Sequence, residues 1–301
     1  MKGHVVTGKR KKRQYTGLLY IMPWILGFLV FQLYPFISSF IYSFTNYNMT
    51  SNFKFVGLKN YIEIFTRDSQ FYNSLKVTIF YVFMAVPMKL IFALFIAMVL
   101  NIKIKYVNFY RTVYYLPSIL GGSVAVAVLW RFLFADNGLI NEILSSFGIS
   151  KIGWLSKPNM ALFTISLLTV WQFGSSMVIF LAGLKQIPKE LYEAATVDGV
   201  SKAGKFFTIT LPLLTPIILF NLVMQMIIAF QEFTGSFVIT NGGPMKSTYL
   251  YAMKLYDEGF LFMKMGYASA LSWILFIVIM IFTALIFRSS EYWTYYEDGR
   301  Q

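Results

Sequence analysis

The sequence predicts an all-α membrane protein with six transmembrane helices and both termini in the cytoplasm. Of its 301 residues 57% are hydrophobic and 13% are charged, whereas a soluble domain carries about 25% charged residues. Six apolar stretches are each long enough for the roughly 20-residue helix that crosses a bilayer core. Lys and Arg residues are also spread unequally between alternate connections, which predicts the orientation.

The first predicted span, Gly17–Phe44, follows a strongly basic tail. The tail, residues 1–16, holds six of the 26 Lys and Arg residues, and such a cluster keeps an N-terminus in the cytoplasm. The apolar part exceeds the roughly 7–15 residues of a signal-peptide core, so a cleaved signal is not expected. Pro23 or Pro35 can kink this long helix.

Five further apolar stretches complete the predicted bundle. They are Asn73–Leu100, Thr112–Phe134, Ala161–Leu184, Leu211–Thr240 and Tyr267–Phe287. Pro87 and Pro216 lie inside two of them, where neighbouring helices can compensate the lost hydrogen bond. We therefore expect one transmembrane domain, residues 17–288, followed by a cytoplasmic tail, residues 289–301.

Charge counting supports this orientation. With a cytoplasmic N-terminus, the inside segments hold fifteen Lys and Arg residues and the outside connections hold eight, as the positive-inside rule requires. The longest cytoplasmic connection is then residues 185–210. The net charge of +13 is thereby explained by topology rather than by nucleic-acid binding.

Composition excludes several classes of chemistry. The chain has no cysteine, and its single histidine, His4, lies in the basic tail. Disulfides, thiolate metal sites and cysteine nucleophiles are therefore excluded, and a histidine-based metal site or triad is not expected. No internal repeat is evident.

The cytoplasmic connection contains the polar stretch "ELYEAATVDGVSKAGKFFTITLPLL". Pro188 and the acids Glu190 and Glu193 suit the first turns of a short amphipathic helix. Its apolar side would be made by Leu191, Ala194, Ala195 and the segment from Val197 to Val200. Asp198 and Gly199 predict a turn.

A second short helix, Lys202–Thr208, would lead to Pro212, which would open the fifth span. These residues alone leave two interpretations, an ordinary interfacial helix or a surface that another protein binds.

The spacing of this stretch resembles a known signature. Glu193-Ala194-Ala195, three residues, Gly199, nine residues and Ile209-Thr210-Leu211-Pro212 match the E-A-A-x3-G-x9-I-x-L-P loop of ABC importer permeases. Other stretches, including "YRTVYYLPSILGG", "VITNGGP" and "GYASALSW", resemble the carbohydrate-uptake branch of that family, the maltose and multiple-sugar type. The resemblance implies a type I ABC importer permease fold in the bacterial cytoplasmic membrane.

The resemblance also implies partners. In that family the loop is a coupling helix that docks on an ATPase, so Glu193, Ala194, Ala195, Asp198 and Gly199 would contact that subunit. The chain has no G-x-x-x-x-G-K-[ST] phosphate loop, so ATP and Mg would be bound by two copies of a partner ATPase, and this chain would not be an enzyme. A second permease, an extracytoplasmic sugar-binding protein and an oligosaccharide would complete the system.

Polar residues inside the predicted spans are candidates for the substrate pathway, because such residues are costly in a membrane. At 100° per residue, Asn221, Gln225 and Glu232 lie within about 40° of one another around the axis of the fifth span. Amides, carboxylates and aromatic rings suit a sugar, although such residues also hold helices together. The candidates are Trp171, Gln172, Ser175, Asn221, Gln225, Glu232 and Lys89.

Lys89 leaves several interpretations open. It can pair with Glu232, meet an acidic sugar, or extend its amine toward the cytoplasmic surface. One rival is an ion-coupled secondary transporter that uses Lys89 and Glu232, although such proteins usually show internal repeats with broken helices. An intramembrane enzyme is the other rival, and it would need catalytic groups that this composition lacks.

Overall fold

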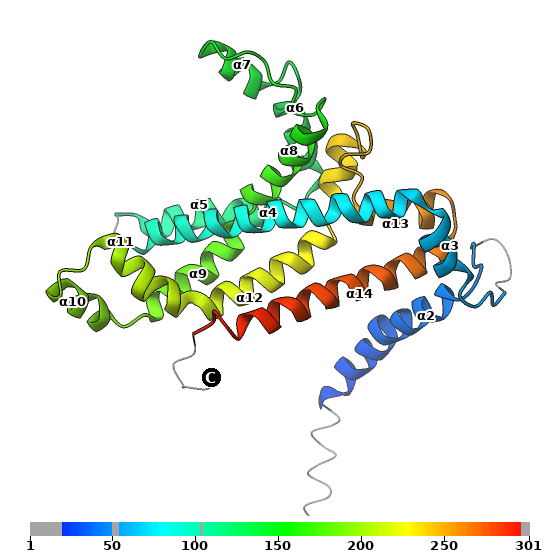
Figure 1. Cartoon of the computed structure of the whole chain (residues 1–301), viewed down its shortest axis with the longest axis horizontal. Coiled ribbons are helices and arrows are strands. Elements are labelled where there is room, and N and C mark those ends of the chain that lie inside the picture. Colours follow the sequence, from blue (N-terminus) through cyan, green and yellow to red (C-terminus); the bar gives the residue numbers. More distant parts are fainter. Residues whose placement is uncertain (1–19, 50–53, 103–104, 296–301) are drawn as a thin grey trace, which may run out of the picture. The chain divides into compact units, whose positions relative to one another are not determined.

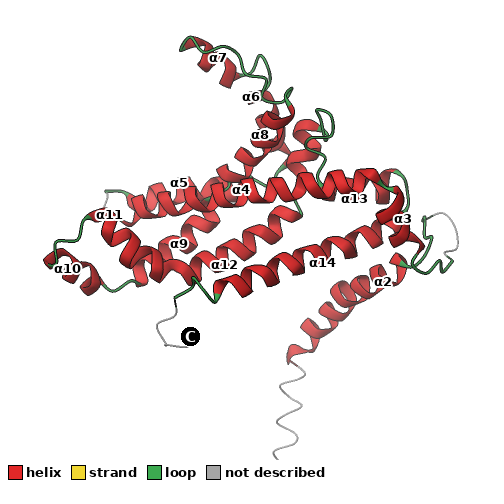
Figure 2. Cartoon of the chain, in the orientation of Figure 1, coloured by secondary structure: helices red, strands yellow, loops and turns green. Residues whose placement is uncertain are grey.

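The computed structural model describes residues 20–49, 54–102 and 105–295. All regular elements in these ranges are helical, which confirms the predicted all-α class (Figure 2). The basic tail, residues 1–16, lies outside the described residues. The chain forms two compact units, Met1–Arg67 with Glu258–Trp273 and Asp68–Asp257 with Ile274–Gln301.

The first unit contains the first predicted span. A helix covers Tyr20–Ser43, and its second half consists of a π-helical turn η1, Leu29–Leu33, and α2, Tyr34–Ser43. Neither Pro23 nor Pro35 ends this helix.

The short helix α3, Lys59–Arg67, is fixed to the end of α2. The buried Asn60 amide donates to the carbonyl oxygens of Ser43 at 2.8 Å and Thr45 at 2.9 Å. These two bonds satisfy carbonyls at the helix end that have no partner within the helix.

The second unit is built on α4, Ser69–Asn101, which is 33 residues long and spans about 50 Å at 1.5 Å per residue. Asp68 caps its start, because the carboxylate accepts a hydrogen bond from Phe71 N at 3.1 Å. Pro87 lies inside α4 without ending it. The helices α8, Pro158–Trp171, α9, Gly174–Gln186, and α12, Leu211–Phe230, all pack on α4 (Figure 1).

Two predicted spans are broken rather than continuous. The third consists of α5, Val107–Leu120, and α6, Val124–Leu133, which meet at 100°. The Ser123 hydroxyl accepts from Val126 N at 3.4 Å and starts α6 afresh after the two glycines. The fourth span is α8 and α9, bent by 48°. A short helix α7, Leu139–Ser146, follows α6.

The fifth predicted span begins earlier and ends earlier than expected. The elements α11, Lys202–Lys205, η2, Phe206–Thr210, and α12 form one 29-residue helix, so Pro212 does not open a new helix. The π-helical turn places the Leu211 N–H on Phe206 O, and the missing N–H of Pro212 is thereby accommodated.

Helix α12 ends at Phe230, ten residues before the predicted end. The chain then runs through η3, Ser236–Thr240, α13, Tyr251–Tyr256, and η4, Asp257–Leu261, into α14, Met265–Ser290. Among the described residues four helices are long and apolar enough to cross a membrane, or six if each bent pair is one span. This agrees with a multi-pass protein of six spans.

Candidate functional site

The connection predicted to face the cytoplasm, residues 185–210, folds into an elbow of two helices. Helix α10, Lys189–Val197, ends at Asp198, and α11 starts after Ser201, whose hydroxyl accepts from Gly204 N at 3.1 Å. Gly199 turns the chain with φ +73°, in the left-handed region that glycine adopts without steric cost. The predicted helix, turn and second helix are therefore present, although the second helix continues into α12.

Several contacts hold the elbow in shape. Tyr192 Oη lies 2.8 Å from Thr210 Oγ1, and Lys205 Nζ donates to Thr196 Oγ1 at 2.6 Å. Val200 N donates to Ala195 O at 2.9 Å. These contacts connect α10 to the turn, to α11 and to the π-helical turn η2 that follows.

The predicted docking residues differ in exposure. Glu193, Ala194, Asp198 and Gly199 are exposed, whereas Ala195 is buried against the base of the elbow. Val197, which was predicted on the apolar side of this helix, is 88% exposed. It lies one turn after Glu193, so both side chains face outward together.

A polar cluster lies inside the second unit between α4, α8 and the end of α12. Lys89 is 5% exposed, and its charge interacts with that of Glu232. The two residues form no ion pair within 4.0 Å. Tyr81, fully buried in α4, lies 2.6 Å from Thr169 Oγ1 of α8 through its hydroxyl.

Glu232 does not continue the predicted stripe, because α12 has already ended. Its carboxylate accepts from Gly235 N at 2.7 Å and so caps the turn that leads into η3. Asn221 and Gln225 are buried in α12. The Asn221 amide donates to Ile217 O at 3.1 Å, and its Oδ1 atom has no partner.

The second predicted patch lies at the break between α8 and α9. Gln172 Nε2 donates to Gly121 O at 2.9 Å. Ser118 Oγ donates to Gln172 O at 3.1 Å and accepts from Ser175 N at 3.0 Å. The ring of Trp171 lies 6.0 Å from that of Trp130. These contacts join the two broken spans to each other.

Sequence reasoning missed Tyr81, Thr169 and Ser118. Tyr81 and Lys89 are eight residues apart and thus about 80° apart on one helix, so their shared face was a usable signal. No comparable signal identified Thr169 or Ser118, because their partners come from other helices.

Comparison with known proteins gives a consistent result. Residues 66–292 match the family described as the binding-protein-dependent transport system inner membrane component. A probable ABC transporter permease protein of Bacillus subtilis, YesP, is 49% identical over 97% of this chain and 95% of the relative. The arabinooligosaccharides transport system permease AraP of the same organism is 34% identical, over 90% and 87%.

More distant matches agree. The trehalose/maltose transport system permease MalF of Thermococcus litoralis is 33% identical over 95% of this chain and 98% of the relative. A chain from a bacterial alginate ABC transporter, solved in complex with an alginate pentasaccharide-bound periplasmic protein, has the same fold. The TM-score is 0.80, with 20% identity over 94% of this chain and 96% of that one. The chain therefore belongs to the family of binding-protein-dependent transport system inner membrane components, the permeases of ABC transporters.

Proposed function

We propose that this chain is the membrane-spanning permease of an ATP-driven importer of oligosaccharides and that the α10 elbow couples it to a separate ATPase. The exposed elbow carries this proposal. Glu193, Ala194 and Val197 form an outward face, to which they contribute a charged, a small and an apolar side chain respectively. The contacts between Tyr192 and Thr210 and between Lys205 and Thr196 hold this face outward, where another protein can contact it.

The substrate class is inferred from the relatives and from the buried polar residues. Relatives are named for arabinooligosaccharides, lactose and trehalose or maltose. Within this chain, Trp171, Gln172, Ser175, Asn221, Gln225, Glu232 and Lys89 are the proposed lining of the pathway. Asn221 Oδ1 has no protein partner, which supports its proposed role, because a buried acceptor of this kind can take a hydrogen bond from a sugar hydroxyl.

The proposed mechanism is alternating access. Two copies of an ATPase bind ATP and Mg, and their closure moves the elbow of this chain and that of a second permease. An extracytoplasmic binding protein delivers the sugar. Shifting a two-state equilibrium from 1:99 to 99:1 needs about 5.5 kcal/mol. This chain contributes differential binding between the two states and no covalent chemistry.

This assignment places the protein in the bacterial inner membrane. The transmembrane domain would cover residues 17–288, with the coupling loop at 185–210 and a C-terminal tail at 289–301. An ion-coupled carrier is not favoured. The two bent helix pairs would suit such a carrier, but it would have no use for the anchored elbow, and the family match points to ATP-driven transport.

The test is co-purification from native membranes in mild detergent. Tagged wild-type chain is expected to elute with a second permease and an ATPase, and the eluate is expected to hydrolyse ATP. Glu193→Lys is expected to lose the ATPase while it keeps the second permease, because the reversed charge lies on the outward face of α10.

The matched control is Glu142→Lys, which makes the same charge change at an exposed position of α7. It is expected to keep the whole complex. A wild-type chain that elutes alone, with no ATP hydrolysis, would overturn the proposal.

A further inference from the structure

The chain turns back sharply after α14, within the second unit. Thr294 N donates to Ser290 O at 2.9 Å, and Trp293 Nε1 donates to Ser289 Oγ at 3.3 Å. These bonds fold the segment that follows α14 against the end of this helix. We call this segment, residues 291–295, the strap.

The far end of the strap is bonded to α12. Tyr295 N donates to Thr215 Oγ1 at 2.8 Å, although the two residues are 80 positions apart in the sequence. Figure 1 shows the end of α14 beside the start of α12. The strap therefore joins the last long helix of the chain to the helix that begins at the elbow.

A proline explains how Thr215 holds this position. In an α-helix the N–H of residue 216 would donate to the carbonyl of Pro212, but Pro216 has no N–H. The Thr215 hydroxyl donates to this carbonyl instead, at 2.6 Å, and its oxygen can still accept a hydrogen bond. One hydroxyl thus replaces a missing bond of α12 and binds Tyr295 of the strap.

The two arms of the elbow meet close to this bond. Helix α9 enters the elbow at Ile187, and the helix Lys202–Phe230 leaves it. The two helices touch at Gly183, where an added Cβ would collide with the side chain of Ile217. Thr215 lies only two residues before Ile217, so the strap is attached where both arms converge.

A cleft of about 270 Å³ separates the strap from the base of the elbow. Its lining includes Gln186 and Pro188, where α9 passes into α10, as well as Pro216 of α12 and Tyr295 of the strap. The cleft leaves room for the base of the elbow to approach Tyr295 without displacing a packed side chain.

We propose that the strap transmits movement of the elbow to α14. When the ATPase moves the elbow, its base closes the cleft against Tyr295, and α14 moves together with α12. Small movements at one site are passed on in this way by packed and hydrogen-bonded elements that have two arrangements. This inference rests on the proposed function, because the ATPase supplies the movement.

The test is disulfide cross-linking across the cleft in the complete transporter, purified with its ATPase and held in lipid nanodiscs. The chain has no cysteine, so Gln186→Cys and Tyr295→Cys together introduce one defined pair. A disulfide needs the two Cα atoms within about 7 Å, and its yield therefore reports closure of the cleft. The yield, read from the loss of maleimide labelling of this chain, is expected to rise several-fold with ATP and vanadate, which trap the closed ATPase pair.

Thr215→Val, added to the same cysteine pair, tests the anchor of the strap. Valine keeps the branched shape of threonine but cannot accept from Tyr295 N, so the nucleotide-dependent rise in yield is expected to disappear. Thr215→Ser keeps a hydroxyl and is expected to retain the rise. The matched control is Thr208→Val, which is also expected to retain it, because the Thr208 hydroxyl donates to Gly204 O within its own helix.

A disulfide yield that ATP and vanadate leave unchanged, in a complex that hydrolyses ATP, would overturn the strap proposal and leave the importer assignment intact. A full rise in Thr215→Val would also overturn it, since the bond to α12 would then be dispensable. If no ATPase assembles with the wild-type chain, the importer assignment itself fails, and the strap proposal fails with it.

Discussion

At the scale of single residues, Gly199 makes the sharpest prediction. Its φ of +73° is left-handed, and nothing lies within 4 Å of the position where a Cβ would be. Only the backbone conformation therefore restricts substitution. Gly199→Val should cost about 1–2 kcal/mol in the elbow conformation and lower ATP-driven sugar uptake several-fold.

Gly199→Asn is the discriminating variant, because asparagine enters the left-handed region more readily than other residues. Uptake into inverted or intact vesicles, normalised to the amount of protein in the membrane, is expected to be close to wild type for Asn. Equal losses for Asn and Val would show that the glycine is needed for contact with a partner rather than for the turn.

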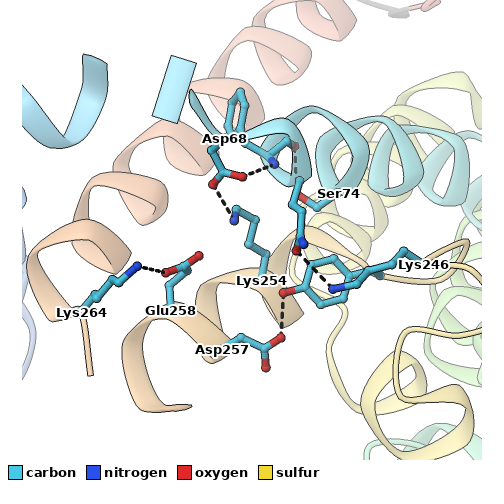
Figure 3. Close-up of polar contacts among 10 residues, drawn as sticks. Asp68, Ser74, Lys246, Lys254, Asp257, Glu258 and Lys264 are labelled. Atoms are coloured by element: carbon cyan, nitrogen blue, oxygen red, sulfur yellow. Dashed lines mark hydrogen bonds and ion pairs between the residues drawn. The ribbon is translucent and has the colours of Figure 1, made fainter. Parts of the chain in front are cut away.

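The buried pair of Asp68 and Lys254 makes a second prediction at this scale. Asp68→Asn keeps a good helix cap but removes the carboxylate charge that lies 2.6 Å from Nζ of a lysine that is 1% exposed (Figure 3). Removal of one partner from a buried pair costs about 3–5 kcal/mol. We expect the low end of that range, about 3 kcal/mol, because the Asp68 side chain is 14% exposed.

Unfolding of the detergent-solubilised chain, followed by its midpoint in denaturant, measures this loss. Glu258→Gln is the matched control, since Glu258 pairs at 3.5 Å with Lys264, which is 58% exposed. The Glu258 side chain is itself 13% exposed, but the pair is longer and its lysine lies in water, so its loss is expected to cost less than that of the Asp68–Lys254 pair. Similar midpoints for the two variants would show that the buried pair does not stabilise the folded chain.

At the scale of elements, the two broken spans depend on each other. Ser118 Oγ donates to Gln172 O and accepts from Ser175 N, so one hydroxyl joins α5 to both sides of the α8–α9 break. Ser118→Ala is expected to cost about 1–3 kcal/mol, because a half-buried carbonyl and a half-buried N–H lose this hydroxyl partner together. The same denaturant midpoint checks it.

Ser166→Ala provides the control for this element. Ser166 is fully buried, but its hydroxyl donates to Leu162 O within its own helix. Its loss should cost less than that of Ser118, since the freed carbonyl keeps its helical hydrogen bond. A Ser166→Ala loss that equals the Ser118→Ala loss would contradict a joining role for Ser118.

The elements also show where sequence reasoning succeeds and fails. The long apolar helices and the elbow follow from local signals, namely apolar length, a first-turn proline and a turn glycine. The breaks in the third and fourth spans depend on bonds such as Gln172 Nε2 to Gly121 O, between residues 51 positions apart. Hydropathy cannot register such bonds, so both spans were predicted as continuous.

The same limit applies to the candidate site. Asn221 and Gln225 were placed correctly inside α12 because helical periodicity extends that far. Glu232 was placed on the same stripe, but it lies beyond the helix end and caps the next turn. Val197 was predicted on the apolar side of its helix, but the residue type does not indicate whether that side is covered, and the side chain is 88% exposed.

At the scale of the whole molecule, every proposal depends on one orientation in the membrane. The elbow must face the ATP-containing side, and the connections predicted to be outside must face the opposite side. The excess of Lys and Arg on one set of connections predicts this orientation. The chain contains no cysteine, so single cysteines can test it directly without any background substitution.

Val197→Cys and Phe147→Cys are suited to this test, because the two side chains are 88% and 78% exposed and lie on connections predicted to face opposite sides. A membrane-impermeant maleimide should label Phe147→Cys in intact cells. It should label Val197→Cys only after permeabilisation, and the cysteine-free wild type should remain unlabelled in both. The reverse pattern would place α10 outside, where no ATPase can bind it, and would remove the physical basis of the coupling proposal.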